Sequence, residues 1–179
     1  MRNDIERVLI AEEVIGKRLD AMARDIERDF PRGPLVVVIL LKGALVFAAD
    51  LLRRVPRVLE IECLNVASYH GGTASSGQVD FLDRHFPEVR GRHVLLLDDI
   101  LDTGRTLHAV IERLREEGAA AVHTGVLLAK DKQRAAAVTA DYVGFEIGDE
   151  FVVGYGLDYQ GKYRNLPYVG VLKVPAAAG

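Results

Sequence analysis

Apolar residues in the first part of the chain recur with two different periods. Between residues 12 and 30 they return at helical spacing with charged residues between them, which predicts an amphipathic helix. Its predicted apolar face consists of Val14, Leu19, Met22, Ile26 and Phe30. The run Leu35–Leu41 is uninterrupted and rich in β-branched residues, which predicts a strand that is buried on both faces.

The same two patterns alternate along the rest of the chain. Helices are predicted at residues 43–54, 104–117 and 132–138, and strands at 58–69, 92–97 and 122–129, with short strands after 142. This alternation predicts an α/β fold with an open, mostly parallel twisted sheet flanked by helices. A chain of 179 residues favours a single domain over residues 1–179, with a frayed tail at 175–179. Residues 70–78, HGGTASSGQ, have the composition of a mobile loop.

Composition and charge narrow the class of protein. The net charge of −3 shows no basic excess of the kind that binds nucleic acid. The apolar run Leu35–Leu41 is too short to span a bilayer, which needs roughly 20 residues, and the N-terminus lacks a signal-peptide core. The single cysteine, Cys63, suits a reducing compartment and is expected to be a small buried residue. We therefore expect a cytoplasmic protein with neither a nucleic-acid nor a membrane partner.

In open parallel sheets, ligands bind beyond the carboxyl ends of the strands, which points here to the segments after Leu41, Leu97 and Ala129. The most informative of these segments is Leu95–Leu107, LLLDDILDTGRTL. An acidic pair follows its apolar strand, and Asp-Thr-Gly-Arg-Thr then leads into a helix. A glycine lets the backbone approach an anion closely, and a helix N-terminus favours phosphate. Taken singly, these residues also fit a solvated turn and a helix cap.

The order of residues in this segment resembles the diphosphate-sugar motif of the type I phosphoribosyltransferases. Four further stretches are similar to the hypoxanthine-guanine phosphoribosyltransferase family, and the resemblance runs from about residue 5 to residue 174. They are Leu41–Gly43, Ser68–Tyr69, Leu127–Asp131 (LLAKD) and Asp141–Pro167. The resemblance implies the type I phosphoribosyltransferase fold with a small hood formed by terminal segments. It also implies a Mg²⁺ cofactor and a homodimer or homotetramer.

The resemblance assigns the sugar-phosphate site. Asp102 is implied as the general base or acid at the purine, although a role in fixing the loop stays open. Asp98 and Asp99 are implied to accept hydrogen bonds from the ribose hydroxyls or to bind the metal, directly or through water. The implied diphosphate and phosphate contacts are Lys42, Gly43, Thr103, Gly104, Arg105, Thr106 and Arg164. In the family the backbone of this segment binds pyrophosphate, often with a cis peptide before the lysine. A sequence does not reveal that bond.

The resemblance also assigns the purine site. Lys130 is implied to donate to the exocyclic oxygen of a 6-oxopurine, and an ammonium, having donors only, would penalise adenine. Phe151 is implied to stack on the purine and the backbone of Val152 to meet its edge, while Asp158 is implied as the second magnesium ligand. Ser68 and Tyr69 are implied to begin a mobile loop over residues 68–80. The plain alternatives are a solvated lysine, a core aromatic and a surface loop.

The implied reaction converts 5-phosphoribosyl 1-diphosphate and hypoxanthine or guanine to the nucleotide and pyrophosphate in purine salvage. One departure from the family pattern is the pair Asp98-Asp99, where Glu-Asp is usual, so that Asp98 is one methylene shorter. Three alternatives stay open at this stage. They are a xanthine-preferring enzyme, a nucleic-acid-binding regulator that retains the sugar-phosphate site, and a nucleotide-binding module without catalysis.

Overall fold

A six-stranded sheet forms the centre of the protein. The computed structural model describes residues 4–30, 33–68, 79–132 and 135–173. In spatial order the strands are β4 (Val79–Phe81), β3 (Leu59–Ser68), β2 (Leu35–Leu41), β5 (His93–Leu101), β6 (Ala121–Lys130) and β7 (Tyr142–Ile147). All neighbours pair in parallel except β4, which is antiparallel to β3. The predicted open, mostly parallel sheet is therefore confirmed.

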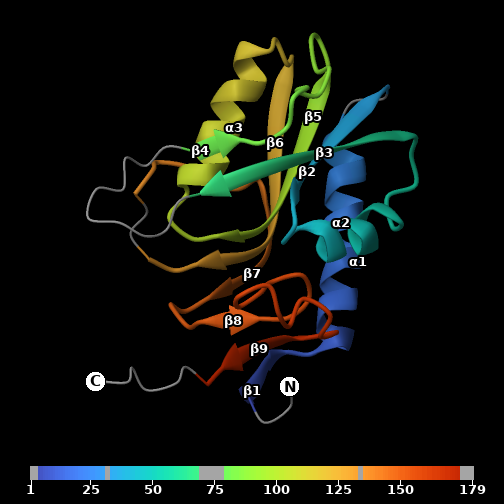
Figure 1. Ribbon diagram of the computed structural model, residues 1–179. Helices are drawn as coiled ribbons and strands as arrows, with labels where there is room; N and C mark the ends of the chain where they lie inside the picture. Colours follow the sequence, from blue (N-terminus) through green and yellow to red (C-terminus); the bar gives the residue numbers. More distant parts are fainter. Residues whose placement is uncertain (1–3, 31–32, 69–78, 133–134, 174–179) are drawn as a thin grey trace.

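Helices cover both faces of this sheet. Helices α1 (Glu12–Asp29) and α2 (Leu45–Leu52) lie on one face, and α3 (Arg105–Glu116) lies on the other (Figure 1). Side chains of β2 alternate between the two resulting cores. Val37 and Ile39 pack with the residues of α1 and α2, whereas Val36 and Val38 pack with those of α3. A strand with a helix on either side has no polar face, which explains the uninterrupted apolar run.

The first helix has a slightly different apolar face from the predicted one. Its buried residues are Ile15, Leu19, Met22, Ala23 and Ile26. Val14 is 49% exposed, so its placement in the predicted face was wrong. Ile15 and Leu19 are four residues apart and share one side of the helix, which turns Val14 toward solvent.

The ends of the chain meet in a second, smaller sheet, which we call the hood. It consists of β1 (Ile5–Ile10), β9 (Val169–Leu172) and β8 (Val152–Val153), in the order β1-β9-β8 and antiparallel throughout. Figure 1 shows it beyond β7. Ile5, Val153, Leu166 and Leu172 form its own apolar cluster. The predicted hood of terminal segments is thus confirmed.

Three local predictions differ from the structure. The described residues of 132–138 form bends and extended chain, because Ala135 and Ala136 donate their backbone N–H groups to Thr103 O at 3.0 and 3.2 Å. The predicted helix there was wrong. Cys63 is exposed, because strand alternation directs Leu64 into the core and Cys63 to the opposite face. Val79 and Asp80, included in the predicted loop, pair with β3 as strand residues. The rest of that loop and the 175–179 tail lie outside the described residues.

Candidate active site

The acidic pair lies inside a strand rather than after it. The apolar pattern predicted that the strand would end at Leu97, but β5 continues to Leu101 and stays paired with β6 through Asp98 and Leu101. A short turn then leads into α3. Gly104 caps this helix with a φ of 78°, and a Cβ there would lie 2.6 Å from Val138 Cγ1. Glycine is therefore required at this turn, both by the backbone conformation and by the close approach of Val138.

A pocket of about 330 Å³ opens at the carboxyl ends of β2 and β5. Nine of the predicted site residues line it, and they come from three separate regions of the chain. They are Gly43, Asp98, Asp99, Asp102, Thr103, Gly104, Thr106, Asp158 and Arg164. Leu40, Leu41, Val66, Ile100, Leu101 and Leu107 supply its apolar walls. The N-terminus of α3 opens onto this pocket, and the first backbone N–H groups of a helix have no intrahelical partner, which makes the pocket suitable for an anion.

Two neighbouring carboxylates form the acidic part of the pocket. Asp98 Oδ1 accepts the backbone N–H of Asp99 at 2.9 Å, and Asp99 Oδ1 accepts that of Ile100 at 3.0 Å. Burial, together with the adjacent charge of Asp99, raises the pKa of Asp98 well above its usual value. Burial also raises the pKa of Asp99. Two desolvated carboxylates side by side favour a cation or hydrogen-bond donors as a ligand.

The segment between β2 and α2 packs directly against Asp99. The peptide bond between Leu41 and Lys42 is cis. A Cβ on Gly43 would overlap with the Asp99 carboxylate, and a Cβ on Gly156 would overlap with the carbonyl oxygen of Gly43. Lys42 itself is exposed, and its side chain does not line the pocket. Gly43, rather than Lys42, therefore faces the pocket.

Asp158 and Arg164 close the pocket from the side of the hood. Arg164 Nη2 lies 2.6 Å from Asp158 Oδ1, and Arg164 Nη1 donates to Gly156 O at 2.6 Å. Asp158 Oδ2 accepts the backbone N–H of Gly161 at 2.7 Å. The positive charge of Arg164 also counteracts the rise in the pKa of Asp99. This guanidinium thus pairs with Asp158 and lies close enough to Asp99 to act on its charge.

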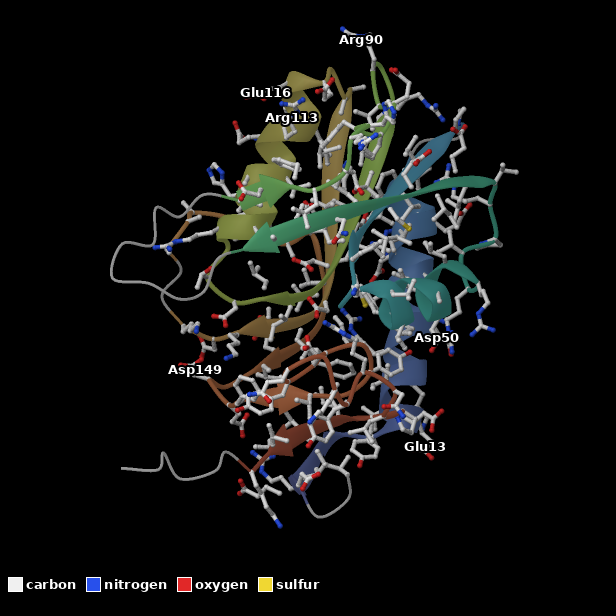
Figure 2. All side chains as sticks on the ribbon, viewed as in Figure 1. Glu13, Asp50, Arg90, Arg113, Glu116 and Asp149 are labelled. Atoms are coloured by element: carbon white, nitrogen blue, oxygen red, sulfur yellow. The ribbon has the colours of Figure 1, made fainter. Side chains whose placement is uncertain are left out.

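Asp102 lines the pocket and also belongs to a cluster of four charged side chains, with Lys130, Lys132 and Asp149. Its Oδ1 forms an ion pair with Lys132 Nζ, and its Oδ2 lies 3.6 Å from Lys130 Nζ. Asp149 Oδ1 accepts from both ammonium groups, at 2.9 Å from Lys130 Nζ and 3.0 Å from Lys132 Nζ. The Lys130 side chain is only 11% exposed, whereas Asp149 is 63% exposed. Asp149 lies at the edge of the molecule, where the chain passes from β7 to β8 (Figure 2).

Comparisons with known proteins agree with this geometry. The phosphoribosyl transferase domain family matches residues 9–160. The chain is 44% identical over 173 residues to a hypoxanthine-guanine phosphoribosyltransferase of Staphylococcus epidermidis, covering 97% of each protein. A crystal structure of a hypoxanthine phosphoribosyltransferase from Staphylococcus aureus superposes with a TM-score of 0.91 at 42% identity, covering 97% of this chain and 94% of that one. The chain belongs to the hypoxanthine-guanine phosphoribosyltransferase family.

A second kind of relative carries the same domain within a longer protein. The bifunctional protein TilS/HprT of Listeria innocua is 45% identical over 174 residues, which is 97% of this chain but 27% of the Listeria protein. The chain thus spans about a quarter of the length of that relative. Other relatives match over 96–97% of their own length and are named hypoxanthine-guanine phosphoribosyltransferases. Enzymes of the family generally need a divalent metal ion.

Three further predicted site residues, Arg105, Phe151 and Val152, do not line the pocket. Arg105 is exposed in the first turn of α3. Phe151 is 44% exposed and meets Tyr159 edge to face, with their ring centroids 5.5 Å apart. Val152 is buried in the main core, as expected for a residue whose side chain only packs. Ser68 is the last residue of β3, and Tyr69 lies outside the described residues.

Sequence reasoning missed Lys132 and Asp149. A usable signal was nevertheless present, because Asp149 follows the predicted strand after Tyr142 and Lys130 ends the preceding strand. In a parallel pair the carboxyl ends of both strands meet at one edge, and Lys130 is paired here with Ile147.

No helix in the described part of the chain is long and apolar enough to cross a membrane.

Proposed function

We propose that this protein transfers the 5-phosphoribosyl group from 5-phosphoribosyl 1-diphosphate to hypoxanthine or guanine. The products are IMP or GMP and pyrophosphate. The observation that carries the proposal is the position of Asp102, which lines the pocket at the N-terminus of α3 and also meets the lysine cluster. A proton-accepting group thus stands between a region suited to a sugar phosphate and a buried lysine suited to a purine oxygen.

The sugar phosphate is proposed to bind along the turn and first residues of α3. Thr103, Gly104, Arg105 and Thr106 would hold the 5-phosphate with hydroxyl and backbone N–H groups. Asp98 and Asp99 would accept hydrogen bonds from the ribose hydroxyls. The backbone of Lys42 and Gly43, together with the guanidinium of Arg164, would hold the diphosphate. This assignment is supported by the shared pocket, in which Arg164 faces the acidic pair.

Magnesium is the proposed divalent ion. The residues present fit it, because Asp98, Asp99 and Asp158 line one pocket and Mg²⁺ prefers oxygen ligands, usually one or two carboxylates with phosphate oxygens and waters. Asp158 would bind it directly, since a carboxylate has about four lone-pair sites and two interactions are in place here. Asp98 and Asp99 would reach it through water. When bound, the ion neutralises charge on the diphosphate.

The purine is proposed to lie between Phe151 and the lysine cluster. Phe151 would stack on its face, and the backbone of Val152 would meet its edge. The Lys130 ammonium would donate to the exocyclic oxygen. As the bond from C1′ to the ring nitrogen forms and the bond from C1′ to the diphosphate oxygen breaks, Asp102 would accept the proton that leaves the purine ring. Two features support this placement: Phe151 is 44% exposed, and it follows Asp149, which pairs with the buried Lys130, by two positions in the chain.

The proposal also includes the domain organisation, the active-site loop, the compartment and the subunit number. Residues 1–179 would act as a single catalytic domain, and the loop that begins at Ser68 and Tyr69 would close over the reacting centre and exclude water. The protein would work in the cytoplasm as a homodimer or homotetramer. Sedimentation of the purified chain tests the subunit number.

A purine panel tests the proposed reaction. Hypoxanthine, guanine, xanthine and adenine are each incubated with 5-phosphoribosyl 1-diphosphate and Mg²⁺, and pyrophosphate release and nucleotide are followed together. We expect turnover with hypoxanthine and guanine and very little with adenine. Preferential use of xanthine would replace the proposed acceptor, and pyrophosphate release from none of the purines would contradict the proposal itself.

A further inference from the structure

The charged cluster beside Asp102 contains one lysine more than the proposed reaction uses. Lys130 and Lys132 both meet the same oxygen of Asp149, at 2.9 and 3.0 Å. Lys132 also forms an ion pair with Asp102, whose other oxygen lies 3.6 Å from Lys130 Nζ. The four side chains therefore balance one another as two positive and two negative charges. Lys132 and Asp149 are the members of the cluster to which the proposed chemistry gives no task.

The two lysines differ in their surroundings. The Lys130 side chain is 11% exposed, so its ammonium depends on protein partners. Lys132 is 29% exposed and lies on the bend after β6. The carboxylates of Asp102 and Asp149 raise the pKa of Lys132, which keeps this side chain charged through the neutral range. It is thus a permanent second cation for both carboxylates.

A count of charges shows what this second cation does. A purine oxygen is a neutral acceptor, and it must compete with Asp149 and Asp102 for the protons of Lys130. With Lys132 present, each of the two carboxylates has another ammonium within ion-pair distance. Without it, both carboxylates would depend on Lys130 within this cluster. Turning Lys130 toward a purine would then leave two carboxylates without a cation from this cluster, at an electrostatic cost.

We propose that Lys132 is a positioning residue for the purine step. It pairs with Asp102 and Asp149 so that the Lys130 ammonium is released to the exocyclic oxygen of the incoming base. Asp149 therefore accepts from both lysines in the free enzyme, and it pairs with Lys132 alone once Lys130 donates to the base. This inference rests on the proposed transfer to a 6-oxopurine and adds to it a residue outside the substrate contacts.

Steady-state kinetics of paired variants tests this role. Lys132→Met is expected to raise KM for hypoxanthine about tenfold, the worth of one charged hydrogen bond, and to leave KM for 5-phosphoribosyl 1-diphosphate within about twofold. Lys132→Arg keeps the charge and should rescue KM for hypoxanthine. Asp149→Asn in the Lys132→Met background should also restore it, because the competing carboxylate is gone. Lys17→Met, the same change on the exposed face of α1, is the control.

Several results would overturn the inference. One is an unchanged KM for hypoxanthine in Lys132→Met, and another is an equal rise for both substrates. A fall in kcat alone would place Lys132 in the proton step instead, and it would also contradict the release of Lys130. Lys132→Gln replaces the methionine variant if the latter does not fold. Wild-type turnover separates the two proposals, since an inactive wild type contradicts the proposed function, whereas an active one with unaltered variants contradicts only this inference.

Discussion

Gly43 and Asp99 lie so close together that no side chain fits between them. They are 56 positions apart in the chain, yet a Cβ on Gly43 would overlap with the carboxylate of Asp99. Parallel pairing of β2 with β5 brings the two together, because Gly43 follows the end of β2 and Asp99 lies beyond the last paired residues of that ladder. The bare backbone of Gly43 thus forms one wall of the pocket, and the acidic pair forms the next.

We predict that Gly43→Ala damages the site more than the fold. The added methyl must displace the Asp99 carboxylate, so kcat/KM for 5-phosphoribosyl 1-diphosphate should fall by at least about tenfold, equivalent to 1.4 kcal/mol. Gly16→Ala is the matched control, because its Cβ would meet nothing closer than Arg54 Nη2 at 3.8 Å in the middle of α1. Equal kinetics for the two variants would show that the position of Asp99 does not matter.

Replacement of Asp102 separates proton transfer from sugar-phosphate binding. Asp102→Asn keeps the shape of the side chain but removes its capacity to accept a proton. Turnover should fall about 10²–10⁴-fold, while KM for 5-phosphoribosyl 1-diphosphate changes little. Single-turnover measurement of nucleotide formation checks this. Unchanged turnover would remove Asp102 from the chemistry and would leave it a role in fixing the turn before α3.

The selectivity for 6-oxopurines should depend on Lys130. Lys130→Met retains most of the buried side-chain volume and leaves Asp149 exposed to water, so folding should tolerate it. The value of kcat/KM for hypoxanthine should drop about 10- to 100-fold, because a charged donor to the base is lost. The ratio of hypoxanthine to adenine use should fall with it. Lys162→Met, at an exposed position, serves as the comparison. A retained ratio in Lys130→Met would assign the discrimination to the backbone.

Metal dependence should involve Asp158. We expect chelation to abolish turnover of the wild type and added Mg²⁺ to restore it. Asp158→Asn should raise the Mg²⁺ concentration for half-maximal turnover about tenfold, because a charged oxygen ligand is replaced by a neutral one. Asp20→Asn, which alters only a surface ion pair with Arg54, should leave that concentration unchanged. Identical Mg²⁺ titrations for both variants would exclude Asp158 as a ligand.

Alkaline pH should destabilise the fold through Tyr142. Burial raises the pKa of Tyr142 to about 12, and the nearby charge of Asp29 adds to the rise. The unfolded value is about 10, so this stabilisation is complete below pH 10 and is lost as the pH rises from about 10 through 12. Urea unfolding across that range should show a steeper loss in the wild type than in Tyr142→Phe. Equal slopes would contradict the assignment, and measurements at pH 8 provide the baseline.

Local sequence patterns predict much of this architecture. The run of β2 predicts a strand buried on both faces, and the order of residues from Asp98 to Thr106 predicts an anion site, because these features depend on periods of a few residues. The prediction that the strand would end at Leu97 was wrong for the same reason. A local apolar pattern stops at a charged residue, whereas pairing with β6 carries the strand on to Leu101.

Tertiary structure decided how the charged groups are combined. Asp149 meets Lys130 only because β6 and β7 are parallel and in register at Lys130 and Ile147. Asp158 and Arg164 reach the acidic pair through the segment between β8 and β9, which the antiparallel hood holds in place. Ala135 and Ala136 do not form the predicted helix, because their backbone N–H groups donate to Thr103 O. Local sequence determines which residues can bind an anion, a cation or a base, but electrostatic pairing acts over a few ångströms, and only the packed sheet brings those residues within that range.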